Sequence, residues 1–302
     1  MTNKMRKNGG EIITTNFIEG DKLPFSNLTS DTLYNLMPHQ SCLEKPNHSI
    51  GVPSSLIKAS NVDCICIKKH SILPSFDSIV VDSIKRRRAL IWVDPSLVPT
   101  ECLACIICLW LEKVRPSDNV GLGIIIPDCE VINPVGKDLK AWVPSSSGPL
   151  IKDATSLKIP VWYPSLRRNH KLLEKISDTF KPIEIFPIVD FPRIIGYAAE
   201  KEIAIHHQML DRYRTRTRNF IYLNSGSPEE GLDMLSKSLE AVSRDGKMPR
   251  SLLLTPGGTS ISYLVSLIAG VLSDATFIIP DHEIPFHKSD RKLGFALMKK
   301  SE

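Results

Sequence analysis

Short apolar runs that end at proline alternate with longer apolar or amphipathic segments through most of the chain. The short runs have the length and composition of strands, and they lie at 89–93, 120–126, 159–163, 183–188, 219–224, 251–254 and 276–279. The longer segments have helical periodicity, and they lie at 99–114, 166–180, 194–210, 227–244 and 261–272. Strands that alternate with helices at crossover spacing predict a mostly parallel sheet, so the expected fold class is α/β.

Two segments repeat the same order of strand, helix and strand. The string Ile-Ile-Pro-Asp-x-Glu followed by an aliphatic residue occurs at 125–131 and again at 278–284. The strands before them also begin alike, with Arg-Ala-Leu-Ile at Arg88 and Arg-Ser-Leu-Leu at Arg250. An internal duplication and a chance match both explain strings this short.

The organisation expected from these patterns is two Rossmann-like lobes with mostly parallel sheets, preceded by an N-terminal extension. Prolines interrupt the short apolar runs of residues 1–75, so this part is expected to be irregular apart from a short strand at 63–67. The first lobe then covers 76–181 and the second covers 182–302.

The composition describes an ordinary globular protein, with 42% hydrophobic residues and a formal net charge of +5 that permits an anionic ligand. The 22 prolines against 16 glycines favour short strand–turn–helix units over a long helical bundle. The longest apolar stretches fall short of the roughly 18 to 20 residues that span a membrane. The cationic residues 1–10 are not followed by an apolar signal-peptide core. We therefore expect a cytoplasmic protein with reduced cysteines and no membrane partner.

The turn from Thr255 to Ser260 is the most informative loop, because ligands of open parallel sheets bind at the carboxyl ends of strands. Gly257 and Gly258 allow a close approach of the backbone, and the next helix offers free N–H groups for a phosphate. Thr259 and Ser260 add hydroxyl donors. The turn lacks the third glycine of a dinucleotide fingerprint and the lysine of a P-loop, so a capped turn without a ligand is the alternative.

Further ligand-binding candidates lie at the ends of neighbouring strands. Asn224 and Ser225 follow the strand at 219–224. Asp281 lies about 20 residues beyond the glycine turn, a distance at which a carboxylate can bind a ribose hydroxyl. Asp281 and Glu283 are also the candidate acid–base pair of an enzyme, although solvated carboxylates at a strand end would show the same pattern.

Four arginines alternate with other residues at Arg212, Arg214, Arg216 and Arg218. In an extended segment all four guanidinium groups would lie on one side, where Arg214 and Arg216 could hold phosphates. A solvated loop is the alternative. Cationic residues also stand at the start of the helix expected at 166–180, where they invite an anion, and they are Arg167, Arg168 and His170.

Metal and cofactor sites are not expected. Cys102, Cys105 and Cys108 have the spacing of an iron–sulfur ligand run, but they lie on an apolar helix that cannot wrap around a cluster. His207 and Asp211 lie one helical turn apart without an evident third ligand.

The segment 219–285 resembles the CARF domains, which are Rossmann-like nucleotide sensors of CRISPR-associated proteins. The likeness rests on Leu-Leu-Leu-Thr-Pro-Gly-Gly-Thr-Ser-Ile-Ser, an apolar helix and Ala-Thr-Phe-Ile-Ile-Pro-Asp. Two such lobes resemble the related SAVED arrangement. The family implies that this turn lines a pocket for a cyclic oligonucleotide or related messenger. Ser260 stands where the CARF pattern usually has lysine, and Asp94-Pro95-Ser96 replaces the glycines in the first lobe.

The resemblance implies a nucleotide-binding sensor in a prokaryotic defence or stress pathway, with a nucleotide-type anion as ligand and a separate effector protein as partner. Two alternatives stay open at this point. One is a nucleotide-processing enzyme on the same scaffold. The other is a non-catalytic subunit whose arginines at 212–218 bind RNA, DNA or an acidic protein.

Overall fold

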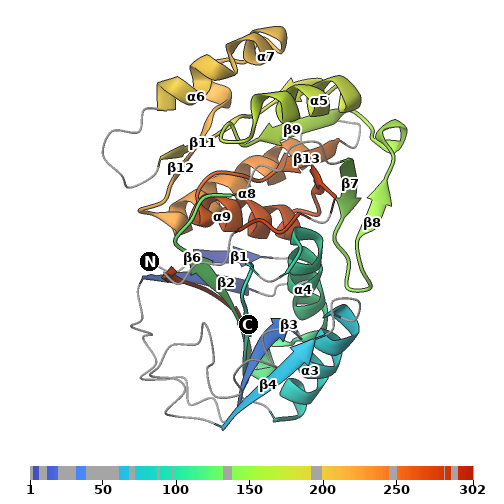
Figure 1. Ribbon diagram of the computed structural model, residues 1–302, viewed down its shortest axis with the longest axis vertical. Coiled ribbons are helices and arrows are strands. Elements are labelled where there is room, and N and C mark those ends of the chain that lie inside the picture. Colours follow the sequence, from blue (N-terminus) through green and yellow to red (C-terminus); the bar gives the residue numbers. More distant parts are fainter. Residues whose placement is uncertain are drawn as a thin grey trace. The chain divides into compact units, whose positions relative to one another are not determined.

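The computed structural model describes residues 3–6, 12–19, 32–38, 61–67, 72–86, 89–96, 98–131, 138–191, 199–244, 250–281, 283–286 and 292–301. The chain divides into two compact units (Figure 1). Unit 1 comprises Met1–Asp128, Ser145–Gly148 and Ile284–Glu302, and unit 2 comprises Cys129–Pro144 and Pro149–Glu283. Within the described residues, no helix is both long enough and apolar enough to cross a membrane.

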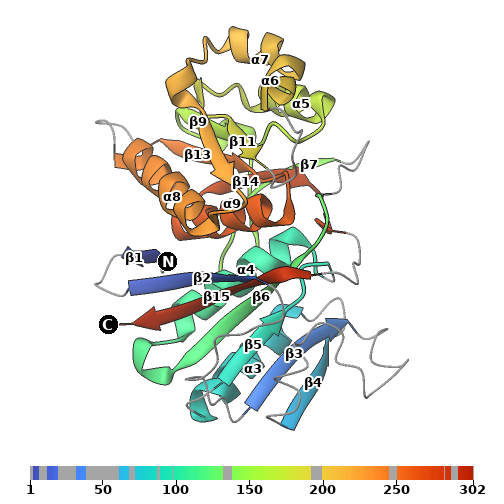
Figure 2. The same ribbon diagram turned by 90° about the vertical axis from the view of Figure 1, so that its left-hand side faces the viewer.

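Unit 1 is built on a seven-stranded mixed sheet with the order β1-β2-β15-β6-β5-β3-β4 (Figure 2). Its strands are β1 (Asn3–Arg6), β2 (Ile12–Glu19), β3 (Thr32–Pro38), β4 (Asn61–Ile67), β5 (Ala89–Val93), β6 (Val120–Pro127) and β15 (Lys292–Ser301). The strands from β4 to β6 are parallel, and those from β6 to β1 are antiparallel. Strand β6 lies at the centre and is buried along its whole length, as expected for a continuous apolar run.

Two helices accompany this sheet, α3 (Ile72–Arg86) and α4 (Thr100–Lys113). Helix α4 begins after Pro99 and ends before Pro116, since neither proline can continue an α-helix in its interior. Most residues of α4 are buried. The segment has apolar residues on nearly all sides because the helix is packed in the core.

Unit 2 contains a six-stranded sheet with the order β10-β9-β13-β14-β7-β8 and a parallel two-stranded sheet, β11-β12. The strands are β7 (Leu139–Val143), β8 (Leu150–Lys152), β9 (Pro160–Pro164), β10 (Glu184–Ile185), β11 (Ile188–Phe191), β12 (Ile221–Asn224), β13 (Ser251–Thr255) and β14 (Thr276–Pro280). The strands from β10 to β14 are parallel, and β7 and β8 add an antiparallel edge. Its α-helices are α5 (His170–Phe180), α6 (Ala199–Ile205), α7 (His207–Arg212), α8 (Pro228–Arg244) and α9 (Ser260–Leu272).

The α/β fold class and the mostly parallel pairing expected from the sequence are confirmed. The expected extension at 1–75 contributes β1 to β4 to the sheet of unit 1. The last strand, β15, pairs with both β2 and β6. Local patterns do not reveal such pairings, because the partners are far apart along the chain.

The units also divide the chain differently from the expected lobes at 76–181 and 182–302. The chain leaves unit 1 after Asp128, which is the end of the first repeated Ile-Ile-Pro-Asp string. Apart from Ser145–Gly148, it returns to unit 1 only at Ile284. The two repeated segments therefore lie in different units, as β5-α4-β6 and β13-α9-β14, and each contains a parallel strand pair. The segment 129–181, assigned to the first lobe, belongs almost entirely to unit 2.

Candidate functional site

The carboxyl ends of β9 and β13 meet at one edge of the sheet in unit 2. The loop after β9 is tied to the glycine turn after β13, because the Ser165 amide donates to the Thr255 carbonyl at 3.0 Å. The Arg168 Nε donates to the Pro256 carbonyl at 2.6 Å. Ser165 also bridges to Ile188, the first residue of β11, so β11 begins at the edge where β9 and β13 end. The turn predicted from the sequence therefore lies where ligands of open α/β sheets bind.

Both glycines of the turn are pressed against side chains of the protein itself. A Cβ atom on Gly257 would lie 2.9 Å from both the Arg168 Cγ and the Ser165 Oγ. Gly258 has φ +93°, and a Cβ there would lie 2.7 Å from the Asp190 Oδ2. The close approach that the glycines allow is used by Ser165, Arg168 and Asp190.

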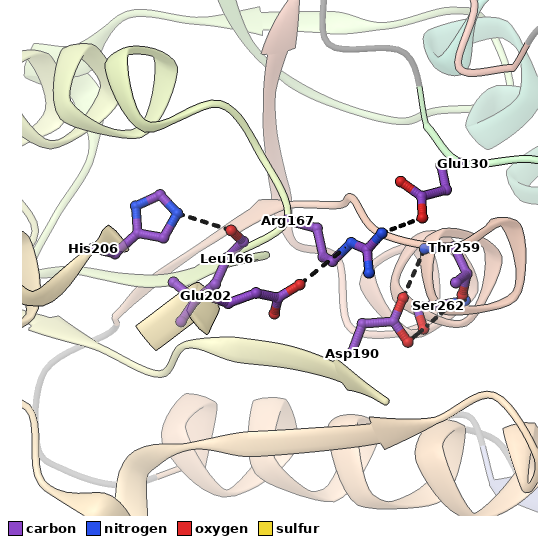
Figure 3. Close-up of polar contacts among 8 residues, drawn as sticks. All are labelled: Glu130, Leu166, Arg167, Asp190, Glu202, His206, Thr259 and Ser262. Atoms are coloured by element: carbon purple, nitrogen blue, oxygen red, sulfur yellow. Dashed lines mark hydrogen bonds and ion pairs between the residues drawn. The ribbon is translucent and has the colours of Figure 1, made fainter. Parts of the chain in front are cut away.

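Asp190 places a carboxylate at the N-terminus of α9 (Figure 3). It accepts hydrogen bonds of 2.7 Å from the Thr259 backbone N–H and 2.7 Å from the Ser262 hydroxyl. Burial raises the pKa of Asp190 above its ordinary value, and these hydrogen bonds and the nearby Arg167 offset that rise only in part. The Thr259 amide at the positive end of the helix therefore already has an acceptor, the Asp190 carboxyl group, at the place where the sequence predicted a phosphate. Sequence reasoning missed Asp190, whose only signal is its place near the end of the run Ile-Val-Asp-Phe.

Arg167 lies among carboxylates (Figure 3). Its guanidinium group forms ion pairs with Glu130 and, at 3.3 Å, with Glu202 on α6. Glu130 is held beside the turn because it forms an isolated β-bridge with Thr259. The cation predicted to invite an anion thus binds the carboxylates of the protein.

Arg168 forms a second ion pair, with Glu283, through contacts of 2.6 and 3.1 Å. Both side chains are almost completely buried. If all groups are ionised, Arg167 and Arg168 face four carboxylates, namely Glu130, Asp190, Glu202 and Glu283. This excess of negative charge disfavours a phosphate at the cluster.

Two histidines, His170 and His206, contact each other next to the loop that follows β9. His206 contacts the Leu166 carbonyl through Nε2 at 2.8 Å and the Nδ1 of His170 through its own Nδ1 at 3.2 Å. The carbonyl can only accept, so the His206 Nε2 donates and its Nδ1 is left to accept from His170. His170 Nε2 lies 3.2 Å from the Glu174 Oε1 on the same helix. Burial lowers the pKa of His206 and favours its neutral form.

The structure gives the two predicted acid–base residues different partners. Asp281 follows β14 and forms an ion pair of 2.6 Å with Lys140 on β7. Glu283 is held by Arg168 in the buried ion pair. Each of the two carboxylates is therefore engaged by its own cation.

Asn224 and Ser225 lie at the carboxyl end of β12, beside the end of β11. The Asn224 Oδ1 accepts from the Gly226 amide at 2.8 Å, and the Ser225 hydroxyl donates to the Phe191 carbonyl at 3.1 Å. The amide NH2 of Asn224 is on an exposed residue, so it can donate to a ligand.

Next to Asn224, the structure reveals exposed aromatic side chains that sequence reasoning missed. Phe191 and Tyr222 are 39% and 37% exposed, and their ring centroids lie 5.4 Å apart. The Tyr222 ring also stacks on Phe220 at 6.2 Å with an interplanar angle of 20°. In the sequence the signal was the aromatic residues at alternate positions of the strand, Phe220 and Tyr222.

The four arginines do not form the expected extended row. Helix α7 ends at Arg212, Arg214 has φ +48°, and a 3-10 turn covers Thr217–Asn219. The fold places this segment before β12, so the arginines lie toward its amino end and Asn224 lies at the opposite end. Arg214 and Arg216 are exposed, and no hydrogen bond or ion pair found among the described residues joins them to the glycine turn.

The cysteines of α4 belong to unit 1 and are thiols of a packed helix. Burial raises the pKa of Cys102 to about 11 and that of Cys105 to about 12. No group of three or more residues of the metal-ligating types is placed to hold a metal ion in the described part of the chain.

The fold and this edge define unit 2 as an open, mostly parallel α/β unit with a polar cluster at the carboxyl ends of its strands. No family model and no curated protein matches the sequence. A putative universal stress protein from Pseudomonas aeruginosa UCBPP-PA14 has 8% identity and a TM-score of 0.26, over 84% of this chain and 95% of that chain. A ketoreductase domain from the bacillaene assembly line has 11% identity and a TM-score of 0.23, over 90% and 70%. At these scores neither structure informs the function of this chain.

Proposed function

We propose that unit 2 is a sensor that binds a nucleotide-type small molecule at the carboxyl ends of β11 and β12. The observation that carries this proposal is the exposed pair Phe191 and Tyr222 beside the amide of Asn224. Accessible aromatic rings offer a stacking surface for flat rings, and a nucleobase stacked on them gains about 1–3 kcal/mol. The amide of Asn224 can donate to the edge of the stacked base.

The polar cluster limits where the phosphate lies. Asp190 accepts from the Thr259 amide, and the carboxylates around Arg167 outnumber the cations. A phosphate there would be repelled, so the proposal directs the phosphate away from the glycine turn. The acidic edge instead suits the hydroxyl and amino donors of a sugar and a base.

Binding without turnover is favoured over the enzyme alternative. The candidate pair Asp281 and Glu283 is engaged by Lys140 and Arg168, so neither carboxylate is poised to exchange a proton. By the resemblance of 219–285 to CARF domains, the bound molecule would be a messenger of a prokaryotic defence or stress pathway. Its binding would be transmitted to a separate effector protein.

Thermal-shift assays and calorimetric titration test this proposal on the full chain with nucleosides, mononucleotides and cyclic nucleotides. A ligand at 100 times its Kd stabilises the folded state by about 2.7 kcal/mol. We expect Tyr222→Ala to weaken binding by about 5- to 150-fold, the equivalent of one stacked base, and Tyr222→Phe to preserve it.

Ile205→Ala is the matched control, because Ile205 is an exposed apolar residue on α6 outside the aromatic pair. It should leave binding unchanged. The proposal fails if no nucleotide or nucleoside stabilises the protein, or if Phe191→Ala combined with Tyr222→Ala leaves the Kd of a bound nucleotide intact.

A further inference from the structure

Three aromatic rings form a continuous row along β12. Phe220, Tyr222 and Phe191 follow one another with centroid separations of 6.2 and 5.4 Å. Phe220 directly precedes β12, and it is half-buried because it also packs against the core of unit 2, so that only part of its ring is accessible beside Tyr222. Phe191 reaches the same face as Tyr222 because its register partner is Asn224, which is two residues beyond Tyr222. One base would cover only part of this row.

Three cations precede the row in the chain. Arg214, Arg216 and Arg218 are exposed, and none of them forms an ion pair with a carboxylate of the described residues. The neighbouring Arg212 differs, because it binds Asp178 at 2.8 Å. The segment 211–218 contains one acidic residue, Asp211, which is exposed near the end of α7. The amino end of β12 thus has an excess of positive charge.

The row of aromatic rings and the exposed arginines together indicate which chemical class of ligand fits this face. Stacked aromatics recognise unpaired bases of any sequence, and guanidinium groups bind the phosphates that link them. The centroid separations of 5.4 and 6.2 Å give the row room for more than one stacked base. A duplex would satisfy the arginines but could not place its paired bases on the rings.

Resting on the proposed function, we infer that the ligand of this face is a single-stranded oligonucleotide of two or more nucleotides. Its terminal base stacks on Phe191 and Tyr222, the preceding base stacks toward Phe220, and the linking phosphates lie toward Arg216 and Arg218. A protein partner with an acidic segment is the competing occupant, and the experiment below separates the two.

Fluorescence anisotropy with a labelled six-nucleotide single strand, in RNA and DNA forms, tests this inference against a mononucleotide and a duplex of the same sequence. We expect the single strand to bind at least ten times more tightly than the mononucleotide. The logarithm of its affinity should fall with the logarithm of salt concentration, with a slope of about −0.7 for each phosphate contact.

Arg216→Gln combined with Arg218→Gln should weaken binding of the single strand about tenfold or more and reduce the salt slope by about 1.4. Arg212→Gln is the matched control and should change neither quantity, because Arg212 is paired with Asp178. Circular dichroism confirms that each exposed substitution leaves the fold intact.

The inference is overturned if the wild-type protein binds the single strand no more tightly than the mononucleotide, which leaves the proposed function standing. It is also overturned if the duplex or an acidic peptide binds as tightly as the single strand, or if the double arginine variant keeps the wild-type salt slope. Loss of both mononucleotide and oligonucleotide binding would instead remove the proposed function itself.

Discussion

Gly258→Ala should destabilise unit 2 strongly, because two separate requirements converge on this residue. Its backbone has φ +93°, a conformation that residues with a side chain rarely adopt. In addition, the new Cβ would lie 2.7 Å from the Asp190 Oδ2, which accepts the Thr259 amide. The carboxylate or the turn must move.

The size of the effect follows from these two contributions. A non-glycine residue in a sparsely populated backbone region costs about 1–3 kcal/mol. Displacing Asp190 from the Thr259 amide breaks a hydrogen bond and leaves a polar group without its partner, which costs about 1–3 kcal/mol. The expected loss in free energy of unfolding is therefore about 2–6 kcal/mol, a large part of the stability of a typical domain.

Urea denaturation of the variant, followed by far-ultraviolet circular dichroism, measures this loss. Gly148→Ala is an informative comparison, because Gly148 has φ +134° but, among the described residues, the neighbour of its Cβ would be the Leu73 Cδ1 at an ordinary contact distance of 3.9 Å. It should lose the backbone contribution alone. In an Asp190→Ala background, Gly258→Ala should likewise cost only about 1–3 kcal/mol. A loss below 1 kcal/mol for Gly258→Ala in the wild-type background would refute the proposed crowding by Asp190.

Three further predictions concern buried charges and thiols. Glu283→Gln should lower the free energy of unfolding by about 3–5 kcal/mol in urea denaturation, because it leaves the buried Arg168 without its counter-charge, and a change near zero would contradict the ion pair. Burial lowers the pKa of His206 below its usual 6.5, so the unfolded state binds more protons and stability should fall as pH decreases through 6.5. Denaturation between pH 5.5 and 7.5 checks this slope, and an equal slope in His206→Gln would assign it to other groups. Cys105, with a pKa of about 12, should resist iodoacetamide at pH 8 until urea unfolds the protein, so modification of the folded protein in a mass spectrum would count against its burial.

The sequence predicted the local elements well where hydrophobic pattern and chain punctuation agree. The strand–helix–strand segments at 89–126 and 251–279 appear as β5-α4-β6 and β13-α9-β14. Proline and capping residues end these elements through local sterics, and local sterics are readable from a few neighbouring residues. The helix expected at 194–210 is less regular, because α6 and α7 are separate short helices with His206 between them.

The candidate site was predicted only in its location. The glycine turn does lie at the carboxyl ends of parallel strands, as the rule for open α/β sheets requires. Its occupant was not predictable, because Asp190 lies about 70 residues earlier and reaches the turn only through strand pairing. The arginine row failed for a related reason, since alternation along the chain has meaning only in an extended segment and this segment is helix and turn.

By itself, the sequence determined the α/β class, the position of most strands and helices, and the edge of the sheet where a site belongs. The tertiary structure alone decided that β15 joins β2 and β6, and that Asp190, Arg167 and Glu202 meet beside Gly258. The physical reason is the separation along the chain of the residues that each feature depends on. Periodicity and capping depend on residues within a few positions of one another, whereas strand partners and buried ion pairs depend on which distant segments pack together.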